Sequence, residues 1–344
     1  MSIAKRAIVF LLVAAAASAA VVYYSSRGPN AAQGPALPEL ITLAPADSAY
    51  LFYANLAALR ASPFLDRLMA LAPSPAADPE YAGFVRATGF DYARDLDRLV
   101  LASRPGPSAP LTLALAEGRF DRARISSYAL RSGTLERGGG AEVYVFPPSP
   151  TSKAMAFAFL NGNRVAMAEG PEAAKAIASL ASDPAPSTFA PSMRERVSRV
   201  ADSAVFAVGQ VADVPQNFSP GGVRSDQFSN LVRSLRWFTL AAHPEGDRLK
   251  VAAEGECDTA ESARQLTGTL DGLRMLGQAM LADPRTRQRL EPATAGLLDN
   301  LLRILQVSRD DQRVRLSLEL TSEMVSRLPG AATRKTPATS PPKR

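Results

Sequence analysis

Two stretches of this chain share one pattern: Glu117-Gly118-Arg119-Phe120-Asp121-Arg122-Ala123 and, later, Glu254-Gly255-Glu256-Cys257-Asp258-Thr259-Ala260. Each stretch comes after two short apolar runs that are separated by turn-forming residues. The runs are 99–103 and 111–116 before the first stretch, and 235–242 and 248–253 before the second. Short β-rich runs joined by such turns are typical of paired antiparallel strands. The shared Glu-Gly-x-x-Asp-x-Ala therefore predicts that the chain contains the same strand pair twice.

Two more matches, in the same order, indicate an internal duplication. Pro45-Ala46-Asp47-Ser48-Ala49-Tyr50-Leu51-Phe52 opens the first half, and Val200-Ala201-Asp202-Ser203-Ala204-Val205-Phe206 opens the second. The runs 165–168 and 314–320 each lead into a predicted helix that closes its half. The three matches are offset by 155, 137 and 149 residues, and unequal offsets indicate insertions between the repeats. We therefore expect an α+β fold with two similar halves, residues 41–190 and 191–330, of mainly antiparallel strands packed with amphipathic helices.

The second half contains a long segment with helical periodicity after Asp258. Apolar residues recur at helical spacing, as Ala263, Leu266, Leu270, Leu273 and Met280. Pro284 and Pro292 fit the first turns of two further helices. The second of these has a broad apolar stripe, made of Leu297, Leu298, Leu301, Leu302, Ile304 and Leu305. Such stripes usually pack in a core, and a groove for a partner is the alternative. The groove residues that we expect are Leu266, Leu270, Leu273, Leu298, Leu301 and Leu305.

Local signals predict turns and caps along the body. Glycine after each strand pair, at Gly118 and Gly255, is expected to let the backbone turn into the next segment. Asp258 with Glu261 resembles a capping box at the start of the long helix. Asn161-Gly162 between two apolar runs predicts a hairpin with a type I′ turn, and Ser62-Pro63 predicts the start of a helix over 62–71.

The N-terminal residues have the pattern of an export signal or a membrane anchor. Lys5 and Arg6 precede an uninterrupted apolar run that contains Ala7, Phe10, Leu11, Leu12, Val13, Val21, Val22, Tyr23 and Tyr24. In one interpretation the chain is cleaved near Ala19 and the product is secreted or soluble in the periplasm. In the other, the 18 residues 7–24 cross the bilayer and the two tyrosines lie at its interface. Apolarity that continues past the cleavage site favours the anchor over residues 1–27.

The remaining composition indicates a globular body between two polar segments. Hydrophobic residues make up 47% of the 344 residues, which is enough for a large core. Residues 28–40 predict a linker, and residues 331–344 have the composition of a disordered basic tail. The formal charge of +6 comes from the ends, because three basic residues lie before residue 28 and four after residue 330, which leaves −1 for the body. A balanced body lacks the basic surface that nucleic acid requires.

The residue types that most enzymes use are scarce in this chain. His243, the one histidine, lies in a predicted hairpin tip, and Cys257, the one cysteine, is expected in the core with Trp237. We therefore expect no metal site, no cofactor and no histidine-based catalysis. Carboxylate-only chemistry, as in glycoside hydrolysis, needs no histidine. The candidate carboxylates are Asp47, Glu117, Asp202 and Glu254, for which a structural role is the alternative.

Two motifs of the first half give the chain a resemblance to a known group. They are Pro45-Ala46-Asp47 with Phe52, and Thr88-Gly89-Phe90-Asp91 followed by Asp95-Leu96-Asp97. With them the chain resembles the uncharacterised exported bacterial proteins that have an N-terminal anchor, a linker and an α+β body. Because similar proteins have no assigned activity, the resemblance implies export and an α+β fold but no catalytic residues.

These observations predict an extracytoplasmic protein of the cell envelope, on the periplasmic side and anchored in the inner membrane by residues 7–24. We expect it to act by binding or scaffolding, with a groove between the halves, bordered by helices 258–281 and 292–307, for an apolar or peptide partner. Its expected partners are the membrane and an envelope protein or apolar ligand. The alternatives are a carboxylate-dependent hydrolase and a purely structural envelope protein.

The fate of the N-terminus is the first prediction to test. We expect the full chain, expressed in cells and fractionated, to be found in the membrane fraction with Met1 or Ser2 at its N-terminus, because the predominantly apolar residues 7–24 contain no charged side chain. Mass spectrometry of the mature protein measures this. A soluble product that starts at Ala20 would contradict the anchor and favour cleavage.

Overall fold

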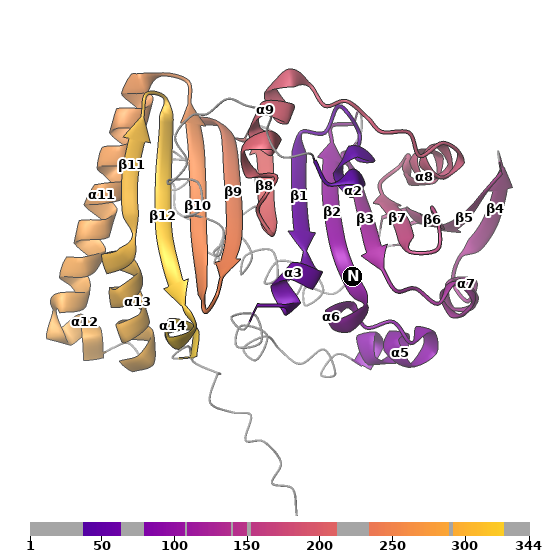
Figure 1. The fold of residues 1–344 in the computed structure, drawn as a ribbon, viewed down its shortest axis with the longest axis horizontal. Coiled ribbons are helices and arrows are strands. Elements are labelled where there is room, and N and C mark those ends of the chain that lie inside the picture. Colours follow the sequence, from indigo (N-terminus) through magenta and orange to yellow (C-terminus); the bar gives the residue numbers. More distant parts are fainter. Residues whose placement is uncertain are drawn as a thin grey trace, which may run out of the picture.

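A single antiparallel sheet of twelve strands forms the framework of the protein (Figure 1). The computed structural model describes residues 37–62, 79–106, 109–138, 140–149, 153–211, 234–288 and 292–326. The strand order is β11-β12-β10-β9-β8-β1-β2-β3-β7-β6-β5-β4. Helices accompany the sheet, so the fold is α+β, as the sequence predicts.

The strands and helices have the following bounds. The strands are β1 (Tyr50–Asn55), β2 (Leu96–Arg104), β3 (Leu111–Gly118), β4 (Thr134–Gly138), β5 (Ala141–Phe146), β6 (Met155–Phe159), β7 (Arg164–Glu169), β8 (Val205–Gln210), β9 (Leu235–Glu245), β10 (Arg248–Cys257), β11 (Gln306–Asp310) and β12 (Arg313–Thr321). The helices are α2 (Glu39–Thr42), α3 (Leu56–Arg60), α5 (Pro79–Thr88), α6 (Tyr92–Asp95), α7 (Arg122–Ala129), α8 (Ala173–Ser182), α9 (Pro191–Val200), α11 (Ala260–Ala282), α12 (Pro284–Gln288), α13 (Pro292–Ile304) and α14 (Ser322–Ser326).

The centre of the sheet is the antiparallel pair of β1 and β8. Their register runs from Tyr50 opposite Gly209 to Ala54 opposite Val205. Outward from this pair the order is β1, β2, β3, β7, β6, β5, β4 on one side and β8, β9, β10, β12, β11 on the other. Between the third and fourth of these strands the chain leaves the sheet, through α7 on one side and through α11, α12 and α13 on the other.

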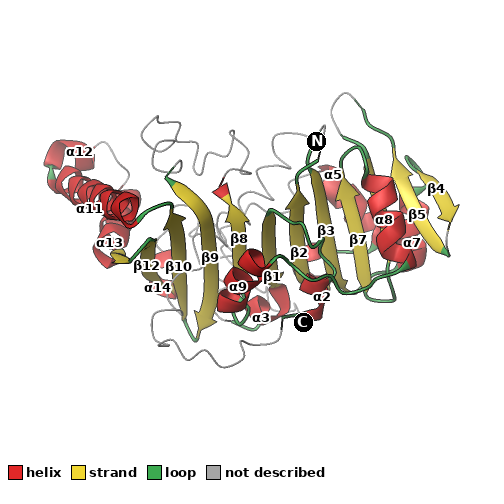
Figure 2. Cartoon of the chain, turned by 90° about the horizontal axis from the view of Figure 1, so that it is seen from above, coloured by secondary structure: helices red, strands yellow, loops and turns green. Residues whose placement is uncertain are grey.

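One face of the sheet is covered by α2, α8 and α9 (Figure 2). Because side chains alternate along a strand, Leu51 of β1 and Phe206 of β8 point to the same face. They join one apolar core with Ile41 of α2, Ile177 of α8 and Val197 of α9, all fully buried. Each such side chain contributes roughly 1.5–3 kcal/mol by burial, so this core fixes the three helices on the sheet.

The opposite face is covered by other helices at its two ends. At one end Ala263 and Leu266 of α11 pack against Val314 of β12. At the other end Ala129 of α7 packs against Tyr144 of β5 and Phe157 of β6. Strand β12 alternates strictly, with Arg313, Arg315 and Ser317 on the face away from α11.

The two helices after the Glu-Gly pairs begin with different caps. Asp121 caps α7, because its side chain accepts a hydrogen bond from the Arg124 amide at 3.0 Å. The predicted capping box at Asp258 and Glu261 is wrong by one residue, since Thr259 caps α11 and accepts from the Ser262 amide at 3.0 Å. The amide of Cys257 still donates to the Gln312 carbonyl at 2.9 Å, so the chain leaves the sheet too late for Asp258 to be the cap.

Two predicted turns need correction. The hairpin of β6 and β7 exists, but Gly162 is not among the positive-φ residues, so the type I′ turn is wrong. The amide of Leu160 donates to the Arg164 carbonyl at 2.9 Å, and residues 161–163 form the loop between these two residues. Within the loop, the side chain of Asn161 accepts from the Asn163 amide at 3.0 Å. His243 lies inside β9, opposite Lys250, and the tip of its hairpin is at Gly246, where φ is +60°.

Three predicted segments lie outside the described residues. They are the apolar run 7–24, most of the helix 62–71 and the tail 331–344. Among the residues that are described, no helix has both the length and the apolarity to cross a bilayer.

The glycines of the Glu-Gly pairs allow close contacts rather than unusual backbone angles. Neither Gly118 nor Gly255 has a positive φ. A Cβ on Gly118 would lie 2.2 Å from the carbonyl oxygen of Asp95, and a Cβ on Gly255 would lie 2.6 Å from Cδ2 of Leu235. The predicted turning role is therefore wrong at both positions, and the close approach of neighbouring chain is the reason for glycine.

This contact yields a prediction with a matched control. Gly118→Ala should lower the free energy of unfolding by about 1–3 kcal/mol, because the Asp95 backbone must move to admit the methyl group. Gly138→Ala, at a strand end with nothing within 4 Å of the added Cβ, should change it by less than about 0.5 kcal/mol. Urea denaturation of the two variants measures the difference, and equal effects would contradict the contact.

Candidate functional site

A hollow of about 680 Å³ opens beside the centre of the sheet. Residues from both sides of the β1–β8 pair line it, with Tyr53 and Arg98 on one side and Ser203 and His243 on the other. Its volume falls in the range of small-molecule pockets, about 300–1,000 Å³. Its charged lining residues include Glu39, Arg98, Glu117 and Arg164.

An ion-pair network holds the charges of the hollow. Arg164 donates to Glu117 at 3.0 Å and forms two hydrogen bonds with Glu39, at 2.8 and 2.9 Å. Arg98 forms a second ion pair with Glu117. The hydrogen bonds and the charge of Arg164 lower the pKa of Glu39. Burial raises the pKa of the nearby Tyr53 hydroxyl.

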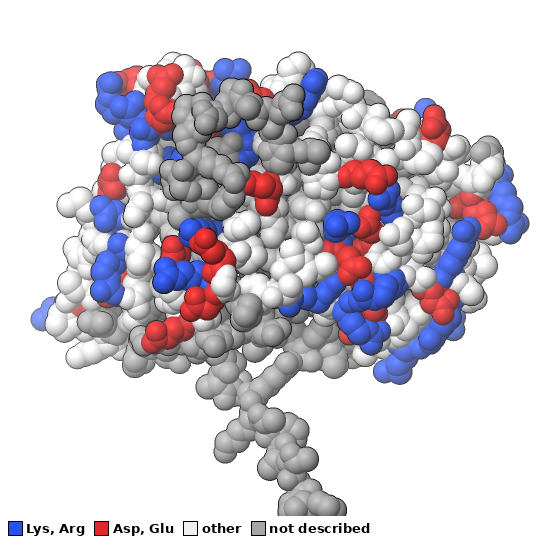
Figure 3. All heavy atoms as spheres, viewed as in Figure 1, with Lys and Arg blue, Asp and Glu red and all other residues white. Residues whose placement is uncertain are grey.

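A second network occupies the corresponding place beyond β8. Glu254 of β10 accepts from Arg315 of β12 at 2.9 Å and lies 3.3 Å from Arg199 of α9. Arg199 also donates to Glu256 at 2.7 Å, and Arg196 pairs with the same carboxylate. Despite the opposing effect of burial, these hydrogen bonds lower the pKa of Glu256. On the face seen in Figure 3, acidic and basic atoms lie beside one another over β10 and β12 rather than gathering by sign.

Arg196 and Trp237 explain how α9 sits on this network. The guanidinium of Arg196 lies over the Trp237 ring, 4.4 Å from its centroid, while it pairs with Glu256. Trp237 is buried, as the sequence predicts, and Cys257 is buried as well. Burial raises the pKa of the Cys257 thiol, which disfavours its reactive thiolate.

The two buried glutamates serve the packing of helices on the sheet. Both Glu117 and Glu254 are 8% exposed, and each accepts from arginines of two other elements. A catalytic carboxylate must be free to reach a substrate, whereas each of these carboxylates is held by two guanidinium groups. Loss of one partner from such a pair costs about 3–5 kcal/mol, because a charge stays buried without compensation. The arrangement therefore fits an ion-pair clamp better than a catalytic pair.

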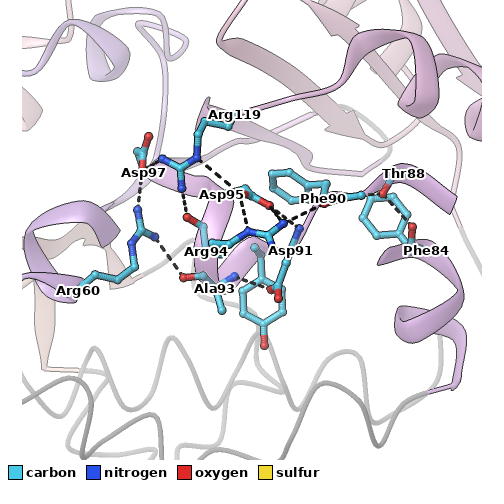
Figure 4. Close-up of polar contacts among 12 residues, drawn as sticks. Arg60, Phe84, Thr88, Phe90, Asp91, Ala93, Arg94, Asp95, Asp97 and Arg119 are labelled. Carbon is cyan, nitrogen blue, oxygen red and sulfur yellow. Dashed lines mark hydrogen bonds and ion pairs between the residues drawn. The ribbon is translucent and has the colours of Figure 1, made fainter. Parts of the chain in front are cut away.

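The motif Thr88-Gly89-Phe90-Asp91 forms the turn between α5 and α6 (Figure 4). Gly89 has φ of +76°, which ends α5 in the left-handed conformation that suits glycine. The buried Thr88 hydroxyl donates to the Phe84 carbonyl at 2.8 Å and accepts from the Phe90 amide at 3.2 Å. Asp91 then caps α6, accepting from the Ala93 amide at 3.0 Å.

Asp95 is the centre of the contacts that follow this turn. Its carboxylate accepts from the Asp91 amide at 3.0 Å. It also accepts from two nitrogens of the Arg94 guanidinium, Nη2 at 2.7 Å and Nε at 3.0 Å. Arg119 lies 3.5 Å from the same carboxylate and donates its backbone amide to the Asp95 carbonyl at 2.8 Å. Arg119 and Arg60 also pair with Asp97 (Figure 4). The hydrogen bonds of Arg94 lower the pKa of Asp95 to about 2.

Exposed apolar side chains gather on a different part of the molecule. Five of the seven large apolar side chains that are exposed in the described ranges belong to α11 and α13; they are Leu273, Met275, Leu276, Met280 and Leu298. Met275 is 62% exposed and Leu276 56% exposed. On a helix, residues three, four and seven apart share a side, so Leu273, Leu276 and Met280 form one stripe with Met275 beside it. We name these four residues the α11 apolar face.

The six predicted groove residues are divided between core and surface. Leu266 is buried, Leu270, Leu301 and Leu305 are half-buried, and Leu273 and Leu298 are exposed. The two helices pack together, and Gln278 of α11 donates to the Leu302 carbonyl of α13 at 3.1 Å. The two helices contact strands at one end of the sheet, namely β10, β11 and β12. In the strand order, β10 and β9 lie between β12 and β8. The expected position, along the junction of two halves, is therefore not where these helices lie.

Comparisons with known proteins identify no family. No family model and no curated protein matches the chain. Three crystal forms of TP0453 are similar in fold. Form IV has a TM-score of 0.44 and 10% identity over 85% of this chain and 96% of that chain, and form III has 0.47 and 9% over 83% and 95%. Form I has 0.41 and 8% over 86% and 98%. A likeness at this level carries no information about function.

Sequence reasoning found some of these groups and missed others. The shared Glu-Gly motif identifies Glu117 and Glu254 as candidate functional carboxylates. It does not predict that both are buried beside arginines. Arg164 and Arg315 give no signal beyond their alternation with apolar residues in β7 and β12. The exposure of Met275 could have been found, since it lies off the stripe that includes Leu266 and Leu270.

The Asp95 contacts generate a prediction about pH. The pKa of Asp95 is lower in the folded chain than its ordinary 3.8, so its contribution is complete above about pH 4 and is lost as the pH falls towards 2. Asp95→Asn should lower the free energy of unfolding by about 1–2 kcal/mol at pH 7, and the deficit should shrink between pH 4 and pH 2.

The control is Asp258→Asn, which removes an exposed carboxylate 3.4 Å from the exposed Arg236. It should change stability by less than about 0.5 kcal/mol at either pH. Denaturation at several pH values checks both variants. A deficit of Asp95→Asn that stays constant from pH 7 to pH 2 would contradict the role of its charge.

Proposed function

We propose that this chain is an exported, membrane-tethered protein of the cell envelope that acts by binding or scaffolding through the α11 apolar face. The observation that carries the proposal is the exposure of four large apolar side chains on one helix. Soluble proteins rarely leave a contiguous apolar patch to water unless it contacts a partner or a membrane. The basic residues followed by the apolar run 7–24 support export and tethering on the periplasmic side.

The body of this protein is, in our proposal, a duplicated unit. The strand orders on the two sides of the β1–β8 pair support it, since each begins with a first, second and third strand followed by two that return from an insertion, and the first side then continues with β5 and β4. The buried ion pairs support it as well. Glu117 lies opposite Arg164 on the neighbouring strand, and Glu254 lies opposite Arg315 in the same way. All three sequence matches fall on equivalent strands of the two units.

The two proposed units differ in the segment that follows their third strand, and the α11 apolar face belongs to this difference. The first unit inserts α7 and the hairpin of β4 and β5, and the second inserts α11, α12 and α13. A packing role would need only the first turns of α11, which hold Ala263 and Leu266. Leu273, Met275, Leu276 and Met280 belong to none of the buried clusters, so a purely structural role leaves these four apolar side chains without a purpose. Of the carboxylates that a hydrolase would need, the buried Glu117 and Glu254 are bound by arginines.

The covering of the α11 apolar face in cells tests the proposal. In a Cys257→Ala background, a thiol introduced by Met275→Cys should react several-fold more slowly with a polar maleimide in intact envelopes than one introduced by Gln265→Cys. Both positions are exposed in the isolated chain, on the same helix. The difference should disappear after denaturation in urea. Equal rates in intact envelopes would refute the proposal, because the face would then be open to water.

A further inference from the structure

We propose that the occupant of the α11 apolar face is the surface of an anionic lipid bilayer, the one in which the chain is tethered. This inference rests on the proposed function, because it names the partner of the same face. Three properties carry it: the position of the apolar side chains on the helix, the charges that flank them, and the ends of the chain.

The apolar side chains lie in the second half of α11, which packs on α13 at Gly277 and Gln278 and leaves its other side chains to water. Its first half packs on the sheet through Ala263 and Leu266. From Gly272 to Ala282 the exposed side presents Leu273, Met275, Leu276 and Met280, and the added Cβ of Gly272 would meet nothing within 4 Å. A helix that turns such a side to water has the form of an interfacial helix, which lies flat with its apolar side among lipid headgroups.

The charges along this half favour an anionic surface. Between Gly272 and Ala282 the chain contains no carboxylate, and Arg274 is its one charged residue, 3.3 Å from Asp271. The exposed Arg285 follows in α12, in a stretch that holds three arginines, at 285, 287 and 289, between Asp283 and Glu291. An acidic surface would attract these arginines, whereas a cationic partner finds no row of carboxylates between Gly272 and Ala282.

The sequence that follows the described chain is basic. The described chain ends at Ser326 in α14, which follows β12 directly (Figure 1). The following residues, 327–344, contain five Lys or Arg and no Asp or Glu. Each basic residue near an anionic bilayer contributes about 1 kcal/mol of attraction, so five of them form a second membrane signal.

The N-terminal tether places a bilayer within reach of this face. Residues 25–36 separate the apolar run from the first described residue, and twelve residues extend to at most about 40 Å. The bilayer is therefore the most concentrated apolar surface near the body. One weak apolar contact becomes stable when a second signal, here a polybasic segment, is linked to it.

The test uses the full chain reconstituted in vesicles, with an environment-sensitive dye on Met275→Cys in the Cys257→Ala background. In vesicles with about 30% anionic lipid the dye should shift to the blue and be quenched by a lipid-attached quencher. In zwitterionic vesicles, or in about 1 M salt, both signals should fall by at least about half. Removal of residues 327–344 should have the same effect as salt.

Two matched variants separate the apolar contribution from general effects. Leu276→Gln with Met280→Gln should abolish the dye response in every vesicle. Leu130→Gln, which changes an apolar side chain that is 50% exposed elsewhere, should leave the response unchanged. A dye on Gln265→Cys, which lies about two turns before Leu273 in the first half of α11, should stay in water throughout, which shows that only the second half of the helix contacts the bilayer.

The outcomes distinguish this inference from the function on which it rests. A dye that stays in water in anionic vesicles, while the thiol remains protected in intact envelopes, would overturn the bilayer and leave a protein as occupant. Concentration-dependent energy transfer between labelled chains in vesicles would overturn it in favour of a second copy. A thiol open to water in the envelope would overturn both proposals.

Discussion

The antiparallel pairing of β1 with β8 is the constraint on which the rest of the structure depends. It joins the seven strands on one side to the five on the other, so that two otherwise separate sheets share one hydrogen-bonded framework. Hydrogen bonds continue past both ends of the pair, from the Asn55 amide to the Ala204 carbonyl at 2.6 Å and from the Gln210 amide to the Ala49 carbonyl at 3.0 Å. Both strands are buried almost throughout, as a sheet centre requires.

This central pair determines where the inserted segments lie. Because each side of the sheet grows outward from it, the segments inserted after β3 and β10 are directed to opposite ends. There they meet different demands: α7 covers aromatic rings of β5 and β6, and α11 covers a narrower apolar strip on β12. A helix of 23 residues is longer than this strip needs, and its second half therefore carries its apolar side chains into water. The proposed binding face is thus the part of α11 that extends beyond the apolar strip of the sheet.

The sequence predicts the elements better than their surroundings. Apolar alternation and turn residues are local signals, so the strands at 99–103 and 111–116 and the helix after Thr259 could be placed. The role of Gly118 could not, because it depends on the Asp95 carbonyl, which reaches it only through the fold. The arginine partners of Glu117 come from α2-facing strands and could not be paired without the register. The position of α11 at one end of the sheet could not be predicted either. It depends on the order of the strands, which local periodicity does not encode.

The central claim is that β1 and β8 unite the two sides into one cooperative sheet. Native-state hydrogen exchange, followed by mass spectrometry or NMR, tests it most directly. The account predicts that the amides of β1 and β8 exchange only through global unfolding and are the slowest in the chain, while those of the edge strands β4 and β11 exchange much faster. Amides of β1 and β8 that exchange as fast as the edge strands, with β3 and β10 still protected, would contradict it, because the two sides would then be separate units in loose contact.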